Sequence, residues 1–181
     1  MMPNVQSKRL IMIPFSPELI RLAIHDRAQL QKTLDIDIPD NWPNTDFAEF
    51  LLMMLEGFEK DSTREVWNGL IILKEQRVLV GDMGFKDGPD AKGTAEIGYS
   101  IVPGYQNHGY ATEMAAALIT WAFKQKGIKK VIAECLNDNI GSIRVLEKLG
   151  MRQSGSNGNT LQWTLSMEQK DLPNSTQEVN R

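Results

Sequence analysis

The sequence predicts a single α/β domain with a mixed central sheet flanked by helices. Strand-like and helix-like segments follow one another in the order β-αα-βββ-α-β-α-ββ, which suits one sheet with helices on its faces. Residues 94–136 read as a strand, a long helix and a second strand, the unit that joins parallel strands by a right-handed crossover. The 181 residues, 41% of them apolar, are enough for one full core. We expect the domain to span residues 8–167 and a polar tail to cover residues 168–181.

The first part of the chain predicts one strand and two helices. Residues 9–15 are apolar and read as a strand. Residues 16–18, Ser-Pro-Glu, have the cap, the proline and the acid that are typical of a helix start, and helical spacing continues to Leu30. Asp46 and Glu49 then resemble a capping box ahead of a second apolar helix.

The middle of the chain predicts a hairpin, a strand and a long helix. Residues 65–73 and 77–85 are rich in β-forming residues and are joined by a short polar turn, so an antiparallel hairpin is expected. Residues 94–102 form the next predicted strand. Residues 111–126 have an apolar stripe at helical spacing, and Gly127 is placed to end that helix.

The last part predicts a strand, a helix and two short strands. Residues 129–136 have an almost unbroken apolar centre, which is expected when both faces of a strand are covered. A helix follows over residues 139–149 and ends at Gly150. Residues 151–167 contain two short strands, separated by the turn-forming residues 154–159.

Composition excludes several classes of protein. A net charge of −3 argues against electrostatic binding of nucleic acid. No apolar run approaches the roughly 20 residues needed to cross a bilayer. The single cysteine, Cys135, and the lack of a signal peptide favour a cytoplasmic location. Two scattered histidines and one cysteine argue against a metal site.

The segment before the long helix has the chemistry of an anion site. The first N–H groups of a helix have no carbonyl partner within it, and the helix dipole makes that end partly positive. Gly109 lets the backbone approach a phosphate, and the amides from Asn107 to Ala111 can form a concave set of donors. In the alternative interpretation, Asn107 caps the helix and Gly109 only relieves a tight turn.

These residues resemble a known family. Residues 106–111, Gln-Asn-His-Gly-Tyr-Ala, fit Q/R-x-x-G-x-G/A, the acyl-CoA pyrophosphate loop of the GNAT N-acetyltransferase superfamily. Residues 95–99 and 139–151 are similar to the flanking strand and helix of its ribosomal-protein N-terminal (serine/alanine) acetyltransferase branch. The resemblance runs from Lys8 to about Met167. It departs from the family pattern at Leu146, where many members have a tyrosine that protonates the leaving thiolate.

The resemblance implies acetyl-CoA or coenzyme A as the cofactor, with its pantetheine arm beside the end of the strand over residues 94–102. Asn139 is either a helix cap, a cofactor contact or both. Arg144, Lys148, Lys124 and Lys126 could each meet the 3′-phosphate, and the sequence does not choose among them. The residues assigned to cofactor binding are Ile101, Val102, Gln106, Asn107, His108, Gly109, Tyr110, Ala111, Asn139 and Ser142.

Two residues are predicted to be catalytic. Glu96 lies in an otherwise uncharged strand and is the expected base that deprotonates the amine; a solvated glutamate or a structural ion pair is the alternative. Ser142 is the expected proton donor to the thiolate, although it could instead satisfy local backbone. His108 lies at a variable position of the loop, so we expect a loop contact there and not a base.

The expected reaction is direct acetyl transfer to a primary amine, with the N-terminus of a ribosomal or other protein as acceptor. A small amine such as a polyamine, amino acid or antibiotic is the alternative acceptor. A non-catalytic acyl-CoA-binding module and a general nucleotide binder are alternative functions, although the P-loop and dinucleotide motifs are absent. Three acids at 35, 37 and 40 could attract a cation, and Trp42 and Trp67 either contact substrate or pack in the core. Both a monomer and a homodimer are compatible with the sequence.

Overall fold

The computed structural model describes residues 4–60, 67–86, 88–125 and 127–170. Within these residues the strands form one eight-stranded sheet in the order β1-β2-β3-β4-β5-β6-β8-β7. The strands are β1 (Val5–Gln6), β2 (Leu10–Pro14), β3 (Asn68–Leu73), β4 (Val78–Phe85), β5 (Thr94–Ile101), β6 (Lys130–Leu136), β7 (Arg152–Asn157) and β8 (Thr160–Ser166). The helices are α1 (Pro17–His25), α2 (Arg27–Leu34), α3 (Thr45–Lys60), α4 (Tyr110–Ala122), α5 (Ile140–Lys148) and α6 (Met167–Lys170).

The sheet is mixed, as the sequence predicts. β3 and β4 form the expected antiparallel hairpin, and β5 pairs antiparallel with β4 on one edge. β5 and β6 are the parallel pair joined by α4, but their ladder covers only Thr94 to Glu96 against Lys130 to Ile132. β5 continues to Ile101 and β6 to Leu136, so the two strands separate beyond Glu96. This separation opens the middle of the sheet.

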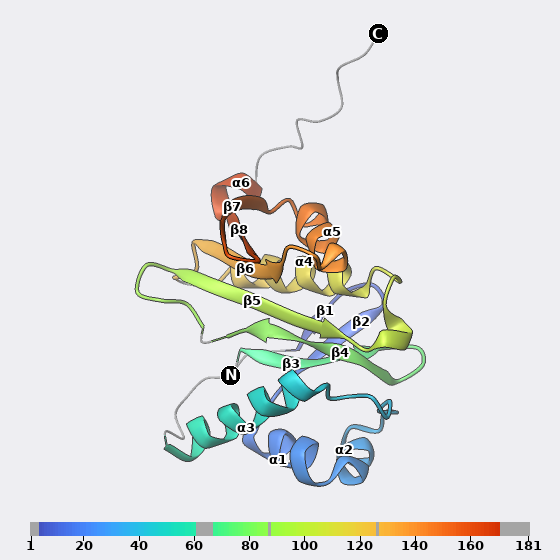
Figure 1. Ribbon diagram of the computed structural model, residues 1–181. Helices are drawn as coiled ribbons and strands as arrows, with labels where there is room; N and C mark the ends of the chain where they lie inside the picture. The colour runs from blue at the N-terminus through green and yellow to red at the C-terminus, as the bar shows by residue number, and fades with distance from the viewer. Residues whose placement is uncertain (1–3, 61–66, 87, 126, 171–181) are drawn as a thin grey trace.

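Helices cover both faces of the sheet (Figure 1). α1, α2 and α3 lie on one face, and α4 and α5 lie on the other. The side chains of β3 alternate between the two sides: Leu70 and Ile72 pack with the first group of helices, and Ile71 and Leu73 belong to the core around α4. The alternation follows from the two-residue period of a strand. Two hydrophobic cores therefore enclose the centre of the sheet.

Three helix boundaries differ from the prediction. The first helical stretch is broken at Asp26, whose carboxylate accepts a hydrogen bond from the Gln29 N–H at 2.9 Å and so begins α2. Asn44, not Asp46, begins α3, because its Oδ1 accepts from the Phe47 N–H at 2.8 Å. α4 ends at Ala122, before the predicted limit; Lys126 lies outside the described residues. A short polar side chain, Asp26 or Asn44, sets the boundary in the first two cases, and a turn ends α4 in the third.

Burial also corrects one strand. β6 alternates between buried and exposed residues, whereas every residue of β3 and β4 is buried. The strand covered on both faces is therefore in the hairpin and not at residues 129–136. β7 runs through most of the predicted turn, and the chain reverses at Gly158 and Asn159. Part of the predicted strand start, at Glu65, lies outside the described residues.

Candidate active site

The loop before α4 presents backbone amides that no described residue uses. Gly109 is the N-cap of α4 and has φ of 79°, and Asn107 has φ of 62°, so both adopt the left-handed conformation. No side chain caps the helix. The N–H groups of residues 107–112 make no hydrogen bond to any described residue. Asn107 is thus not the cap, and the loop has the free donors that an anion site requires.

Arg9 holds this loop in place from the start of β2. Its Nη2 donates to the His108 carbonyl at 2.9 Å, and its guanidinium lies 4.6 Å from the centre of the Tyr110 ring. Glu113 on α4 accepts from Arg9 Nε at 2.7 Å and from the Ser7 hydroxyl at 2.8 Å. Partial burial acts to raise the pKa of Glu113, but these hydrogen bonds outweigh it and lower that pKa. The His108 carbonyl therefore points toward Arg9, and the backbone amides of the loop are left for a ligand.

The edge of β5 that faces β6 carries free backbone groups. The Glu96 carbonyl accepts from Lys86 N–H and the Val102 N–H donates to Val80, so even-numbered residues pair with β4. Because pairing alternates along an antiparallel strand, the backbone groups of Tyr99 and Ile101 point to the other edge, where the Ile101 carbonyl accepts from Gln106 Nε2 at 3.0 Å. Pairing with β6 ends at Glu96, so an extended ligand can add to this edge like a strand.

A groove of about 450 Å³ runs from this edge to the amides before α4, and we call it the loop groove. Every residue predicted to bind the cofactor lines it except Val102 and His108. It is lined by Asn44, Tyr99, Ser100, Ile101, Tyr105, Gln106, Asn107, Gly109, Tyr110, Ala111, Thr112, Asn139, Gly141, Ser142, Arg144, Val145 and Lys148. Of the basic candidates, Arg144 and Lys148 are among the lining residues and Lys124 is not, while Lys126 lies outside the described residues.

Two predicted contacts lie outside the groove for identifiable reasons. The Val102 amide is bonded to the Val80 carbonyl at 2.9 Å, and its side chain is buried in the core beneath α1 to α3. His108 stacks on Tyr110, with ring centroids 5.5 Å apart, and its Nδ1 lies 2.7 Å from the Gln106 carbonyl oxygen. His108 thus makes contacts within the loop, as expected for that position.

The first turn of α5 brings Ser142 to Tyr99. Asn139 caps this helix, accepting from the Ser142 N–H at 3.0 Å, and it also lines the loop groove. The Ser142 and Tyr99 hydroxyl oxygens are 2.9 Å apart. Burial raises the pKa of Tyr99 to about 12, against the opposing effect of the Ser142 hydrogen bond. Leu146, at the place of the family tyrosine, is fully buried, and the hydroxyls of Tyr99 and Ser142 line this end of the groove together with that of Ser100, which donates to Asp82.

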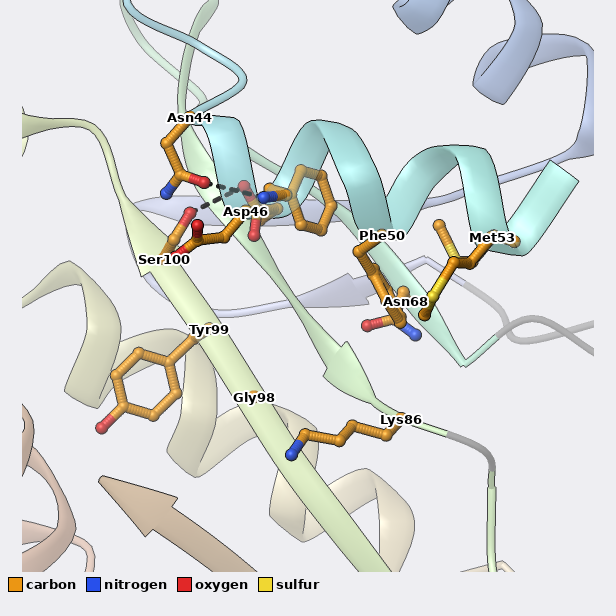
Figure 2. A pocket seen from close by; sticks show the side chains of 12 residues that line it. Asn44, Asp46, Phe50, Met53, Asn68, Lys86, Gly98, Tyr99 and Ser100 are labelled. Carbon is orange, nitrogen blue, oxygen red and sulfur yellow. Dashed lines mark hydrogen bonds between the residues drawn. The ribbon is translucent and has the colours of Figure 1, made fainter. Parts of the chain in front are cut away.

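A second pocket of about 590 Å³ opens between α3 and the sheet, and we call it the α3 pocket. Figure 2 shows Asn44, Phe50 and Met53 along its α3 side and Lys86 and Tyr99 along the opposite side. Its lining residues are Asn44, Asp46, Phe47, Phe50, Met53, Met54, Asn68, Asp82, Lys86, Gly98, Tyr99 and Ser100. Asn44, Tyr99 and Ser100 line both cavities, so the α3 pocket and the loop groove meet at β5.

Glu96, the predicted base, makes an ion pair with Lys86 across the β4–β5 edge. Its side chain is 27% exposed, and it is absent from the residues that line the α3 pocket. It is also the last residue of β5 to pair with β6. The geometry therefore shows the ion pair that was the alternative interpretation of this residue.

Sequence reasoning missed Asp82, the one buried acid among the described residues. It is 2% exposed, and its Oδ2 accepts from Trp42 Nε1 at 2.9 Å and from the Ser100 hydroxyl at 2.8 Å. Burial raises its pKa to about 7, although both hydrogen bonds act to lower it. The signal was present in the sequence, because Asp82 is the only charged residue of the strand 78–85.

Other candidates for the acceptor site are used elsewhere. Trp42 is buried in the core and Trp67 packs against Trp121, with ring centroids 5.6 Å apart. Asp35 pairs with Arg77, and Asp40 pairs with Arg27. Cys135 is a buried free thiol. None of these residues lines the α3 pocket.

Two structural features are absent from the described residues. No helix in that part of the chain is long and apolar enough to cross a membrane. That part also contains no group of three or more His, Cys, Asp or Glu side chains arranged to hold a metal ion.

Comparison with known proteins agrees with this architecture. An uncharacterized N-acetyltransferase of Bacillus subtilis, YjdG, is 32% identical over 81% of this chain and 88% of its own. The ribosomal-protein-S5-alanine acetyltransferase of Vibrio fischeri superposes with a TM-score of 0.62 at 15% identity, covering 91% of this chain and 97% of its own. The microcin C7 self-immunity acetyltransferase MccE, solved with acetyl-CoA and AMP, superposes with a TM-score of 0.61 at 16% identity, covering 88% and 93%. Residues 9–152 match the acetyltransferase (GNAT) domain, and the chain therefore belongs to the GNAT acetyltransferase family.

Proposed function

We propose that this GNAT N-acetyltransferase transfers the acetyl group of acetyl-CoA directly to the α-amine of a protein or peptide N-terminus. The observation that carries the proposal is the junction of the two cavities at Asn44, Tyr99 and Ser100. A donor in the loop groove and an acceptor in the α3 pocket would meet there without crossing the protein. Both substrates can therefore be bound at once, as a ternary mechanism requires.

The loop groove fits acetyl-CoA. The unpaired amides of residues 107–112 suit its pyrophosphate, and the free edge of β5 suits its amide-containing pantetheine arm. Arg144 and Lys148 supply positive charge on the α5 wall for its phosphates. Acetyl-CoA bound in this way would place its thioester toward Tyr99, at the end of the groove near the α3 pocket.

Proton transfer favours an α-amine over a lysine. An α-amine, with a pKa of about 8, is roughly 10% neutral at pH 7, whereas a lysine at about 10.4 is only about 0.04% neutral. The departing thiolate needs a proton, and the hydrogen bond between the Tyr99 and Ser142 hydroxyls supports the proposal that this pair supplies it. Glu96 as the base remains a prediction, set against its ion pair with Lys86.

For the acetyl acceptor, the structure supports a second candidate. The Vibrio fischeri neighbour is a ribosomal-protein-S5-alanine acetyltransferase, which supports a protein N-terminus as the acceptor. The α3 pocket, at about 590 Å³, lies within the size range of small-molecule sites, which favours a small amine as the second candidate. A polyamine, an amino acid or an amine-bearing antibiotic would each be of that class.

Turnover with matched acceptors tests the proposal. Release of coenzyme A is measured with a set of peptides that have free N-termini, with the same peptides N-terminally blocked, and with a panel of small amines. We expect free peptides to be acetylated and blocked peptides, even those with lysine, to react poorly. Faster turnover of small amines than of every peptide would replace the proposed acceptor. Coenzyme A binding without acetylation of any amine would contradict catalysis itself.

A further inference from the structure

Asp82 is a buried carboxylate that no described cation neutralises. Both of its hydrogen bonds come from neutral donors, Trp42 and Ser100, and both end on Oδ2. Lys86, the cation that shares the α3 pocket, is paired with Glu96. Oδ1, the second carboxylate oxygen of Asp82, receives no hydrogen bond from the described residues. A buried, unpaired carboxylate is costly to a fold, so a cation that enters the pocket would find a favourable partner in it.

The position of Asp82 connects it to the reacting end of the donor site. Asp82 lies opposite Ser100 in the β4–β5 ladder, and Ser100 lines both cavities. The carboxylate is thus one hydrogen bond from the wall where the two cavities meet. The neighbouring residue of β5, Tyr99, lines both cavities as well and contacts Ser142.

The wall opposite the sheet is apolar. Phe47, Phe50, Met53 and Met54 of α3 line the pocket, and Met53 is 61% exposed although it is large and hydrophobic. Thioether and aromatic side chains of this kind bind apolar groups of varied shape. The pocket therefore combines one buried carboxylate with one apolar wall.

We propose that Asp82 binds the ammonium group of the acceptor and removes its proton, and that the acceptor is a primary amine with an apolar group next to the amine-bearing carbon. The inference rests on the proposed acetyl transfer and adds to it the base and the chemical class of the acceptor. A peptide with an apolar first side chain has this form, because its α-amine and side chain leave the same carbon.

The proton balance of the step closes. The acceptor R–NH₃⁺ gives one proton to Oδ1 of Asp82 and becomes R–NH₂. Its nitrogen attacks the thioester carbonyl carbon, the C–N bond forms and the C–S bond breaks with its electron pair on sulfur. The thiolate takes a proton from the hydroxyl pair of Tyr99 and Ser142, and the second proton lost by the nitrogen passes to that pair and restores both hydroxyls. Asp82 then releases its proton to water, and the products are the acetamide and coenzyme A.

The acidity of Asp82 suits an α-amine. Burial raises the pKa of Asp82 to about 7, which is close to the pKa of about 8 of an α-amine. Proton transfer from an α-amine is then unfavourable by about 10-fold, whereas transfer from a lysine at about 10.4 is unfavourable by about 2500-fold. Other titratable or charged groups that face the pocket are Asp46 on α3, Lys86 just after β4 and Tyr99 on β5.

The test compares Asp82→Asn with Glu96→Gln, which removes the rival base, and with Glu75→Gln, at an exposed turn residue, as the control. Each variant is assayed with acetyl-CoA and with whichever amine the wild type acetylates best, from pH 5.5 to 9.5, and coenzyme A binding is measured separately. We expect Asp82→Asn to lower kcat/KM by about 100-fold or more, to lose the acidic limb near pH 7, and to leave the Kd for coenzyme A unchanged. The Glu75→Gln variant should keep its activity.

A second variant keeps the test decisive if Asp82→Asn does not fold. Ser100→Ala removes one hydrogen bond that lowers the pKa of Asp82, so the acidic limb of kcat/KM should move to higher pH. An unmoved limb in Ser100→Ala, or activity of Asp82→Asn within about threefold of wild type with the same limb, overturns the role of Asp82. Loss of activity in Glu96→Gln alone assigns the base to Glu96 instead.

The acceptor class is tested in the same assay. Peptides that differ only in the first side chain, with leucine or methionine against glutamate or glycine, should favour the apolar residues by about 10-fold, the value of one or two buried methylenes. Equal or better turnover of the acidic peptide overturns the proposed class. If the wild type acetylates no amine at all, the proposed function fails together with this inference, whereas failure of Asp82→Asn to alter an active enzyme overturns the inference alone.

Discussion

The hydroxyls of Tyr99 and Ser142 lie next to the position that the leaving sulfur would take in the proposed reaction. The two oxygens are 2.9 Å apart, and burial raises the pKa of Tyr99 to about 12. Tyr99 therefore keeps its proton over the whole working range of pH. In the proposed reaction it would take the role that the family gives to a tyrosine at the place of Leu146, from strand β5 and not from helix α5.

Removing each hydroxyl in turn should distinguish the role of Tyr99 from that of Ser142. If Tyr99 protonates the thiolate, Tyr99→Phe lowers kcat by about 100-fold with little change in the KM for acetyl-CoA, since a general acid contributes about that much. Ser142→Ala removes only a hydrogen bond to Tyr99 and should cost about 10-fold or less. Steady-state release of coenzyme A checks both variants. A larger loss in Ser142→Ala than in Tyr99→Phe would make Ser142 the donor, as the sequence predicts.

At the scale of single elements, α4 and α5 begin in different ways, and the difference follows their use. Asn139 caps α5 with a side-chain oxygen, whereas α4 has no side-chain cap and leaves its first amides open. A capped terminus is stabilised by the protein itself, and an uncapped one can be stabilised by a ligand. Gly109 permits the open start, because its φ of 79° disfavours a residue with a Cβ.

Two variants of Asn139 should distinguish its role as the cap of α5 from its proposed contact with the cofactor. Asn139→Ala loses the cap of α5 and should destabilise the fold by about 1 kcal/mol, or about 2–4 °C in Tm. Asn139→Asp keeps a capping oxygen and should retain the Tm, but its charge would repel the phosphates of acetyl-CoA and raise the Kd. Thermal unfolding and coenzyme A titration measure the two effects. An unchanged Kd in Asn139→Asp would leave the cap as its only role.

At the scale of the whole molecule, the α3 pocket imposes a stability cost at Asp82. Burial raises its folded pKa to about 7 from an ordinary value of 3.8, so the native state binds more protons than the unfolded state between those values. Stability from this group therefore falls as pH rises from about 4 to about 7 and stays low above that range. The sign is opposite to that of an ion-paired carboxylate.

Asp82→Asn should reverse that dependence. The neutral amide can still accept from Trp42 and Ser100, so the variant should have a higher Tm than wild type at pH 8, with the difference shrinking toward pH 5. Glu75→Gln, at an exposed turn residue, serves as the control and should shift the Tm equally at both pH values. A Tm of Asp82→Asn below wild type at pH 8 would mean that the carboxylate stabilises the fold.

Most of the order of the elements and the loop of free amides before α4 were predictable from the sequence, but the short strand β1 and the division between α1 and α2 were not. Periodic apolar spacing, the Ser16 cap and the hairpin between β3 and β4 are local signals, and the structure confirms each of them. The free amides before α4 also follow from local chemistry, because no capping side chain precedes Tyr110. Boundaries at Asp26 and Asn44 were wrong, since competing short polar caps lie close together in the sequence.

The two cavities and their meeting point were decided by the tertiary structure. The separation of β5 from β6 beyond Glu96, and the ion pair of Glu96 with Lys86, depend on how strands pair across the sheet. Asp82 became a buried carboxylate because Trp42 and Ser100, 40 and 18 residues away in the chain, close around it. Local hydrogen bonding and periodicity act over a few residues, so the sequence by itself determined the elements and the donor loop. Burial and electrostatics depend on segments brought together from far apart, so only the folded chain decided which buried carboxylate lines the α3 pocket.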